Sequence, residues 1–270
     1  MNKCARLMPA IAFAAIALHN QSATAGGFAL IEQGGSGMGN AYAGAAAVSA
    51  DASTVWFNPA GMLELADPQL AVAGHVISVE NEFSDRGTTL NPAFGLAPVS
   101  GATVTDPGGA TVIPNFYYVR ALRDNLAFGV GVSVPFGNST DYGRDWVGRY
   151  QAVESAVSVI DINPSVAYRV NDQLSIGGGI SVQLFDATLG SAVDSGATCL
   201  GLTSTGTLPL AACANAGLTT PGNLATDGYA EITGDSVATT FNFGVLYKPQ
   251  PATKLGFAYR HSVDHELEGA

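Results

Sequence analysis

Cys199 and Cys213 are the residues whose type and spacing most directly allow covalent chemistry. They lie close together in a segment rich in glycine, threonine and alanine, while the third cysteine, Cys4, lies near the N-terminus. If the chain is exported, as its N-terminal segment indicates, it enters an oxidising compartment that favours closure of so short a loop. We therefore predict a loop disulfide, with two free thiols as the alternative. A metal site is not expected there, because no histidine or third cysteine is near in the sequence.

The histidines offer little further chemistry. His261 and His265 would share one face of a predicted strand with Asp264 on the other, which allows a metal site but fits polar residues at a rim better. No convincing Ser–His pair and no nucleotide-binding motif is present, so we expect no enzyme, no cofactor and no metal. A set of acidic residues could hold divalent cations that bridge to lipopolysaccharide, although a solvated face is the simpler interpretation: Asp194, Asp227, Glu231 and Asp235.

The first 25 residues have the pattern of a secretory signal peptide. Lys3 and Arg6 precede the apolar run 7–18, and small residues follow at 23–25. We therefore predict a signal peptide over 1–25 and a mature start at Gly26. Its removal would lower the net charge from -11 to about -13, so nucleic acid is not an expected partner.

Composition restricts the elements that can carry these residues. The 270 residues include 33 glycines and are 47% apolar but only 12% charged, about half the usual charged fraction. The longest apolar run, 7–18, is shorter than the roughly 20 residues that a membrane-spanning helix needs. These numbers exclude a helical membrane bundle and favour strands.

Apolar residues alternate with small or polar residues through most of the chain, which predicts long β-strands with one oily face. Three short turns and two long connections, 136–155 and 190–230, favour a transmembrane antiparallel β-barrel, with a soluble all-β sandwich as the alternative. The predicted strands cover 69–84, 111–121, 126–136, 156–170, 173–189, 231–248 and 254–268.

Seven strands cannot close a barrel by themselves, because known bacterial single-chain barrels have even strand numbers from 8 upward. We therefore expect 68–270 to be the first half of a barrel that is truncated at its C-terminus. The preceding segment, 26–67, is rich in small residues without a strand period, and we predict that it forms a plug, or hatch, inside the wall.

An ordered series of motifs resembles the FadL/TodX family of outer membrane transporters for long-chain fatty acids and aromatic hydrocarbons. The series runs from Gly26 to the end of the chain: Gly26-Gly27-Phe28, Gly37-Met38-Gly39-Asn40-Ala41-Tyr42-Ala43-Gly44-Ala45, Asn58-Pro59-Ala60, Pro114-Asn115, Trp146-Val147-Gly148-Arg149-Tyr150, Asn163-Pro164-Ser165-Val166-Ala167-Tyr168-Arg169 and Tyr259-Arg260.

This resemblance implies a fourteen-stranded barrel with an N-terminal hatch, located in the outer membrane and monomeric when complete. It places the triplet Asn58, Pro59 and Ala60 in the hatch beside a kink in the third strand that opens a lateral passage. It also places Gly26, Gly27 and Phe28 where they obstruct the ligand pocket. The third strand carries Gly129, Gly131, Ser133 and Pro135, which suit a kink, or alternatively are small residues that face the hatch.

The expected function is passive transport of hydrophobic compounds, such as long-chain fatty acids, with no turnover. Neutral aromatic hydrocarbons are the alternative ligands, and an adhesin or phage receptor without transport is a second alternative. The partners would be the ligand, outer membrane lipid and lipopolysaccharide. Asp186 lies near the position where the family has a basic residue for the carboxylate, which favours a neutral ligand or another anchor. The expected pocket residues are Trp56, Phe57, Phe185, Arg149 and Arg169.

Overall fold

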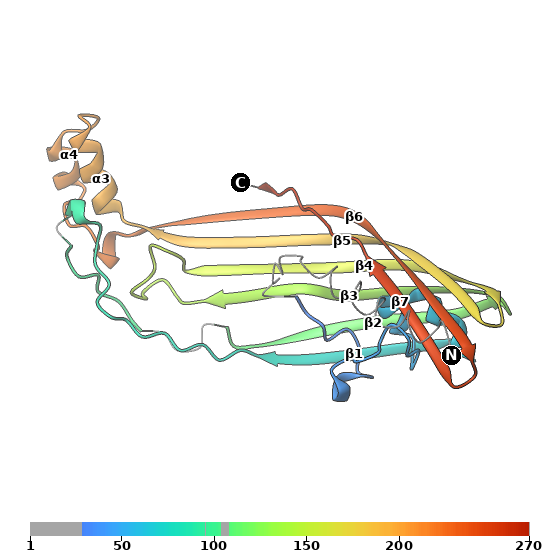
Figure 1. The fold of residues 1–270 in the computed structure, drawn as a ribbon. Helices are drawn as coiled ribbons and strands as arrows, with labels where there is room; N and C mark the ends of the chain where they lie inside the picture. Colours follow the sequence, from blue (N-terminus) through green and yellow to red (C-terminus); the bar gives the residue numbers. More distant parts are fainter. Residues whose placement is uncertain (1–28, 95, 104–107, 270) are drawn as a thin grey trace, which may run out of the picture.

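The computed structural model describes residues 29–94, 96–103 and 108–269. Seven long strands form one antiparallel meander in the order β1 to β7, which curls into half of a barrel wall (Figure 1). The strands are β1 Gln69–Ser78, β2 Ala110–Arg123, β3 Leu126–Asp141, β4 Glu154–Asn171, β5 Leu174–Val193, β6 Gly228–Gln250 and β7 Thr253–Arg260. A short β8, Glu268–Gly269, pairs with β6. The predicted all-β barrel architecture with seven strands is thus confirmed.

The two faces of the wall differ in the way that the alternation predicted. On the convex face, large apolar side chains such as Val166 (55% exposed) and Ile180 (60% exposed) lie open. On the concave face, the alternating residues, for example Ala127, Ser165 and Ser181, are buried. An apolar outer face on strands of up to 23 residues suits contact with lipid, since about 9–11 residues cross a bilayer as a tilted strand.

The predicted boundaries need correction at several strands. The last strand ends at Arg260, because the backbone then leaves the ladder and the Thr240 hydroxyl donates to the carbonyl oxygen of His261 at 3.1 Å. His261 and His265 therefore do not share a strand face. The first strand is also shorter than predicted, whereas β3, β5 and β6 are longer, because pairing with their neighbours continues into segments expected as loops.

The two ends of the wall are built differently. Residues 124–125, 172–173 and 251–252 make the short turns, as predicted, at the end where the hatch lies (Figure 1). The long connections 79–109, 142–153 and 194–227 gather at the opposite end. They contain η3 Pro92–Phe94, α3 Ser195–Ser204, α4 Leu210–Asn215 and η4 Leu224–Thr226. Among the described residues, no helix is long and apolar enough to cross a membrane.

The segment before β1 packs against the concave face of the wall. It contains η1 Met38–Asn40, α2 Thr54–Phe57 and η2 Pro59–Glu64. Its side chains share one buried apolar cluster with wall residues: Ala52, Val55, Met62, Leu63 and Leu65 with Tyr117, Val119, Ala127 and Ala167. We call this segment the hatch; its boundaries at 26–67 stay a prediction, and the predicted signal peptide lies outside the described residues.

Candidate functional site

The wall has a seam between β2 and β3. The ladder between these strands runs only from Phe116 opposite Val132 to Arg123 opposite Leu126. Yet β2 begins earlier, at Ala110, and pairs there with β1, while β3 continues to Asp141 and pairs there with β4. The two strands therefore part toward the end with the long connections.

A bulge in β3 lies at the start of this seam. The register with β4 shifts between Ser133, which pairs with Asp161, and Phe136, which pairs with Val159. Val134 and Pro135 lie within the shift, and Pro135 has no N–H to donate to a ladder. The extra residue bends the strand and reverses which side chains face inward beyond it.

The two glycines predicted to form the kink, Gly129 and Gly131, are not part of the bulge. Gly129 and Gly131 pair regularly with both neighbouring strands. A Cβ on Gly129 would lie 2.5 Å from the Met62 sulfur, and one on Gly131 would lie 2.9 Å from the Tyr117 ring. These two glycines are thus placed as in the alternative interpretation, as small residues facing the hatch and its neighbours, whereas Ser133 is the last paired residue before the bulge and Pro135 lies within it.

Residues 29–33, which we call the strap, cross the seam on its inner side. Ala29 makes an antiparallel bridge with Phe136, and the backbone N–H of Leu30 donates to the Pro135 carbonyl at 2.9 Å. The Gln33 amide donates to the Val134 carbonyl at 3.1 Å. The strap therefore satisfies two carbonyls of the bulge. On the other bank, the Asn115 amide donates to the Glu32 carbonyl at 2.7 Å.

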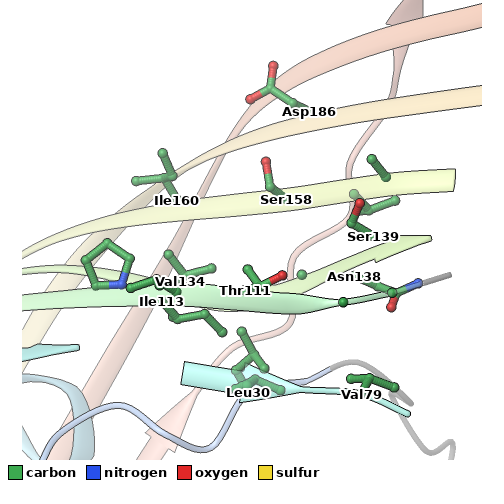
Figure 2. A pocket seen from close by; sticks show the side chains of 18 of the residues that line it. Leu30, Val79, Thr111, Ile113, Val134, Asn138, Ser139, Ser158, Ile160 and Asp186 are labelled. Carbon is green, nitrogen blue, oxygen red and sulfur yellow. The ribbon is translucent and has the colours of Figure 1, made fainter. Parts of the chain in front are cut away.

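A cavity of about 480 Å³ lies at this seam (Figure 2). This volume is within the range of ligand sites in proteins, about 300–1,000 Å³. Its lining combines concave-face residues such as Ile77 and Ile113 with convex-face residues such as Pro114 and Ile160, so residues of both faces of the wall border it. The lining is Leu30, Ile77, Val79, Gly108, Gly109, Thr111, Val112, Ile113, Pro114, Val134, Gly137, Asn138, Ser139, Ala156, Val157, Ser158, Ile160, Asp186 and Thr188.

The cavity is mostly apolar, with polar groups toward one edge. Figure 2 shows Leu30 on the side of β1 and β2, and Ser158 and Asp186 across the cavity on β4 and β5. Among the described lining residues, Asp186 alone has an ionisable side chain. A carboxylate there disfavours a second anionic group at short range, as the sequence suggested.

The concave wall above the hatch is polar rather than apolar. Asp161, which is fully buried, accepts hydrogen bonds from the Ser181 hydroxyl at 3.2 Å and the Gln183 amide at 2.8 Å. The Arg260 guanidinium donates to Ser181 at 2.7 Å and lies over the Trp56 ring at 3.8 Å. Arg260 was not predicted as a site residue; its position on the small-residue face, opposite lipid-facing Tyr259, is the signal that could have found it.

The triplet Asn58–Pro59–Ala60 packs against β5 and β6 rather than beside the bulge of β3. The Asn58 amide donates to the carbonyls of Ala46 at 2.6 Å and Val245 at 3.1 Å, and its side-chain oxygen accepts from the Ala60 N–H at 3.0 Å. The Asn58 side chain thus caps η2 and fastens the hatch to the wall at once. At the bulge itself, the strap makes the contacts.

The structure does not bring the predicted pocket residues together. Arg149 lies in the connection before β4 and Arg169 near the opposite end of that 18-residue strand, so one pocket cannot hold both. Arg169 donates to the Leu63 carbonyl at 2.5 Å. Phe57 stacks on Tyr42, and Phe185 packs against His265. With Trp56 under Arg260, none of the five lines the cavity at the seam.

Arg149 is a structural centre of the long connections. Its guanidinium is fully buried, pairs with Asp227 at 2.6 Å and donates to the carbonyls of Ser100 at 2.7 Å and Gly222 at 3.1 Å. Burial acts to lower the pKa of Arg149, but Asp227 and Tyr150 more than offset this and raise it above its ordinary value. Arg149 therefore stays charged and joins three connections.

Two further predictions concern the two cysteines after residue 190 and the predicted start of the mature chain. Cys199 and Cys213 form a disulfide that joins α3 to α4. Gly26, Gly27 and Phe28 lie outside the described residues, so their predicted obstruction of a pocket stays a prediction. Among the described residues, no group of three or more histidine, cysteine or acidic side chains is placed to hold a metal ion.

A curled antiparallel wall with a lipid-suited outer face and a segment packed on its concave face is the architecture of half of a plugged outer membrane β-barrel. The model of the outer membrane protein transport protein family (OMPP1/FadL/TodX) matches residues 16–270, and the chain belongs to this family. It is accordingly an outer membrane protein.

Sequence and structural similarity to individual proteins supports the same family. The chain is 28% identical to the long-chain fatty acid transport protein of Escherichia coli O6:H1, over 94% of this chain and 54% of that protein. A Pseudomonas aeruginosa FadL homologue of known structure has a TM-score of 0.66 and 23% identity, over 87% of this chain and 53% of the other. The CymD monoaromatic hydrocarbon channel has a TM-score of 0.51 and 20% identity, over 90% and 56%. The chain spans between 36% and 56% of the curated relatives that it matches.

Proposed function

We propose that this protein takes part in passive transport of hydrophobic compounds across the outer membrane, with a lateral exit through the β2–β3 seam. The observation that carries the proposal is the mostly apolar cavity at the seam, which residues of both faces of the wall border and which the strap flanks. The proposal includes no catalytic turnover, because an apolar ligand needs only a dry path and a downstream sink.

The energetics favour a lateral route over a path through the polar interior. An acyl chain gains about 0.8 kcal/mol for each methylene that leaves water, so it prefers the apolar seam. The buried polar groups around Asp161 and Arg260 offer it no such gain. Capture at the long connections 142–153 and 194–227 would precede transfer to the cavity, and movement of the strap would then open the seam.

Long-chain fatty acids are the first candidate ligands, and neutral aromatic hydrocarbons are the second. Similarity to a long-chain fatty acid transport protein over nearly the whole chain supports the first. The cavity volume and Asp186 at its edge support the second, because a small neutral ligand avoids repulsion. An adhesin or phage receptor without transport would not require a strap across an apolar cavity.

A reversible lock on the strap tests the lateral route. Ala29 and Phe136 are bridge partners in antiparallel geometry, and such partners lie within the Cα separation that a disulfide spans. We expect the double variant Ala29→Cys/Phe136→Cys to lose uptake of both oleate and toluene by about tenfold or more when oxidised, and to recover with a reductant. Uptake is measured in cells that express the intact protein.

The two single-cysteine variants are the matched controls, because they carry the same side-chain losses without the bond. Full uptake through the locked protein would exclude exit past the strap. Loss of only one ligand on locking would show which compound class uses the seam. Equal and low uptake by the wild type and by cells without the protein would exclude transport altogether.

A further inference from the structure

Two buried polar side chains lie next to residues that line the seam cavity, and each has an unused hydrogen-bonding atom. His75 on β1 is 6% exposed and Asn115 on β2 is 1% exposed. Within the described part of the chain, neither the Nε2 atom of His75 nor the Oδ1 atom of Asn115 has a hydrogen-bond partner. Buried side-chain polar atoms ordinarily have one, so this pair needs an explanation.

The strand register places the two side chains side by side. His75 pairs across the ladder with Ile113, and Asn115 lies two residues further along β2 on the same concave face. Diagonal neighbours of this kind in an antiparallel ladder lie about 7–8 Å apart, so one small polar group could contact both side chains.

His75 and Asn115 are neighbours of lining residues, although neither lines the cavity itself. Ile113, the cross-strand partner of His75, lines the cavity, and so does Ile77, which lies two residues after His75 on the same face. The strap contacts Asn115, which donates to the Glu32 carbonyl, and Leu30 of the strap lines the cavity. Movement of the strap would therefore free the Asn115 amide and open the cavity toward the pair.

The chemistry of the pair suits a hydroxyl or carboxyl group. An amide oxygen accepts a hydrogen bond, and a histidine Nε2 donates or accepts according to its tautomer. Asp186 lies on the β4–β5 side of the cavity and disfavours an anionic end group there (Figure 2). A ligand with one polar end would thus place that end inward and its chain along the apolar seam.

We propose that His75 and Asn115 bind the polar end group, a hydroxyl or carboxyl, of an otherwise apolar ligand whose chain occupies the seam cavity. This inference rests on the proposed function and sharpens it, since it assigns the protein to amphiphiles with a single polar end rather than to pure hydrocarbons.

Three ligands of equal chain length test the assignment: dodecanol, dodecanoic acid and dodecane. Their binding to the intact protein in lipid nanodiscs is measured by equilibrium dialysis, with empty nanodiscs as the baseline. We expect His75→Phe to weaken binding of dodecanol and dodecanoic acid by about tenfold, the effect of one lost hydrogen bond, and to leave dodecane within about twofold. His75→Gln, which keeps a polar group, should restore part of the preference.

His261→Phe is the matched control, because His261 is an exposed histidine outside the cavity. Equal losses for all three ligands in His75→Phe, or no loss for the two polar ones, would overturn the proposal. Where His75→Phe does not fold, the smaller His75→Leu decides by the same comparison. If the wild type binds none of the three ligands, the proposed function fails; if it binds them without discrimination by His75, only this inference fails.

Discussion

At the scale of single residues, glycines in the wall strands let the hatch backbone approach the wall closely. A Cβ on Gly177 would lie 2.5 Å from the Ala60 nitrogen and 2.6 Å from the Pro59 carbonyl carbon. A Cβ on Gly244 would collide with the Asn58 side chain, and one on Gly256 with the Ala46 backbone. Part of the high glycine content therefore serves close backbone contact between β-strands and the hatch.

Gly177→Ala tests this contact where no flexible side chain can yield. The added methyl would meet hatch backbone, so we expect a loss of about 1–3 kcal/mol in the free energy of unfolding, as for other overpacked sites. Urea titration of the protein in lipid vesicles, followed by tryptophan fluorescence, measures the change.

Gly74→Ala is the matched control for that experiment. Gly74 is also a strand glycine, but it is exposed and a Cβ there would meet nothing within 4 Å. We expect it to change the free energy of unfolding by less than about 0.5 kcal/mol. Equal effects of the two substitutions would show that the hatch does not depend on the close approach at Gly177.

At the scale of elements, an ionic tether joins the end of η2 to the wall. The Glu64 carboxylate contacts the Lys248 ammonium at 2.6 Å and the Lys254 ammonium at 2.9 Å, one near the end of β6 and one in β7. Partial burial acts to raise the pKa of Glu64, but its hydrogen bonds and charge pairing with the two lysines outweigh this and lower it below its ordinary value.

The ion pairs of Glu64 with Lys248 and Lys254 should therefore stop stabilising the fold at low pH. Because the folded pKa lies below the unfolded one, Glu64 stabilises the fold above about pH 4.5 and loses that contribution as the pH falls through its folded pKa. We expect Glu64→Gln to be less stable than the wild type at pH 7 and to approach the wild type below about pH 4. Urea titrations from pH 3 to pH 8 measure the difference.

Glu82 is exposed and provides the control for removal of a negative charge. We expect Glu82→Gln to change the free energy of unfolding little at any pH between 3 and 8. A constant gap between Glu64→Gln and the wild type across the range would contradict an electrostatic tether. It would indicate that the glutamate contributes through packing alone.

Strand β3 shows how much of the elements and the site the sequence could predict. Alternation of apolar and small residues correctly predicted β3 and its two faces, because period two reflects local geometry. It could not distinguish Gly129 and Gly131, which contact Met62 and Tyr117, from Val134 and Pro135, which lie in the bulge. That difference depends on which strand continues to pair with which neighbour.

The connections show the same limit. Cys199 and Cys213 could be paired from their proximity in the sequence, and the structure joins them. Arg149, by contrast, was predicted to contact a ligand, yet its partners Ser100, Gly222 and Asp227 come from connections far away in the sequence. Contacts of this kind follow from the assembled fold and leave no local pattern.

At the scale of the whole molecule, the two ends of the wall are closed by different means. The hatch closes the end with the short turns through close backbone contacts and the Glu64 tether. The three long connections meet at the other end around one buried charge, Arg149. The seam between β2 and β3 lies between these two fixed ends, and the strap spans it.

The closure at the long connections should depend on the Arg149–Asp227 pair as a unit. Removing either partner leaves the other buried without its counter-ion, so Arg149→Met and Asp227→Asn should each cost about 3–5 kcal/mol in the free energy of unfolding. The double variant should cost less than the two single losses together, because neither charge then remains unpaired. Urea titrations measure the cycle, and protease cleavage of the connections in intact cells shows whether the opening is local.

Arg144→Met, which removes an exposed arginine from the same connection, should leave both readings near those of the wild type. Additive losses in the cycle would mean that the two charges act separately and that the three connections are held by other contacts.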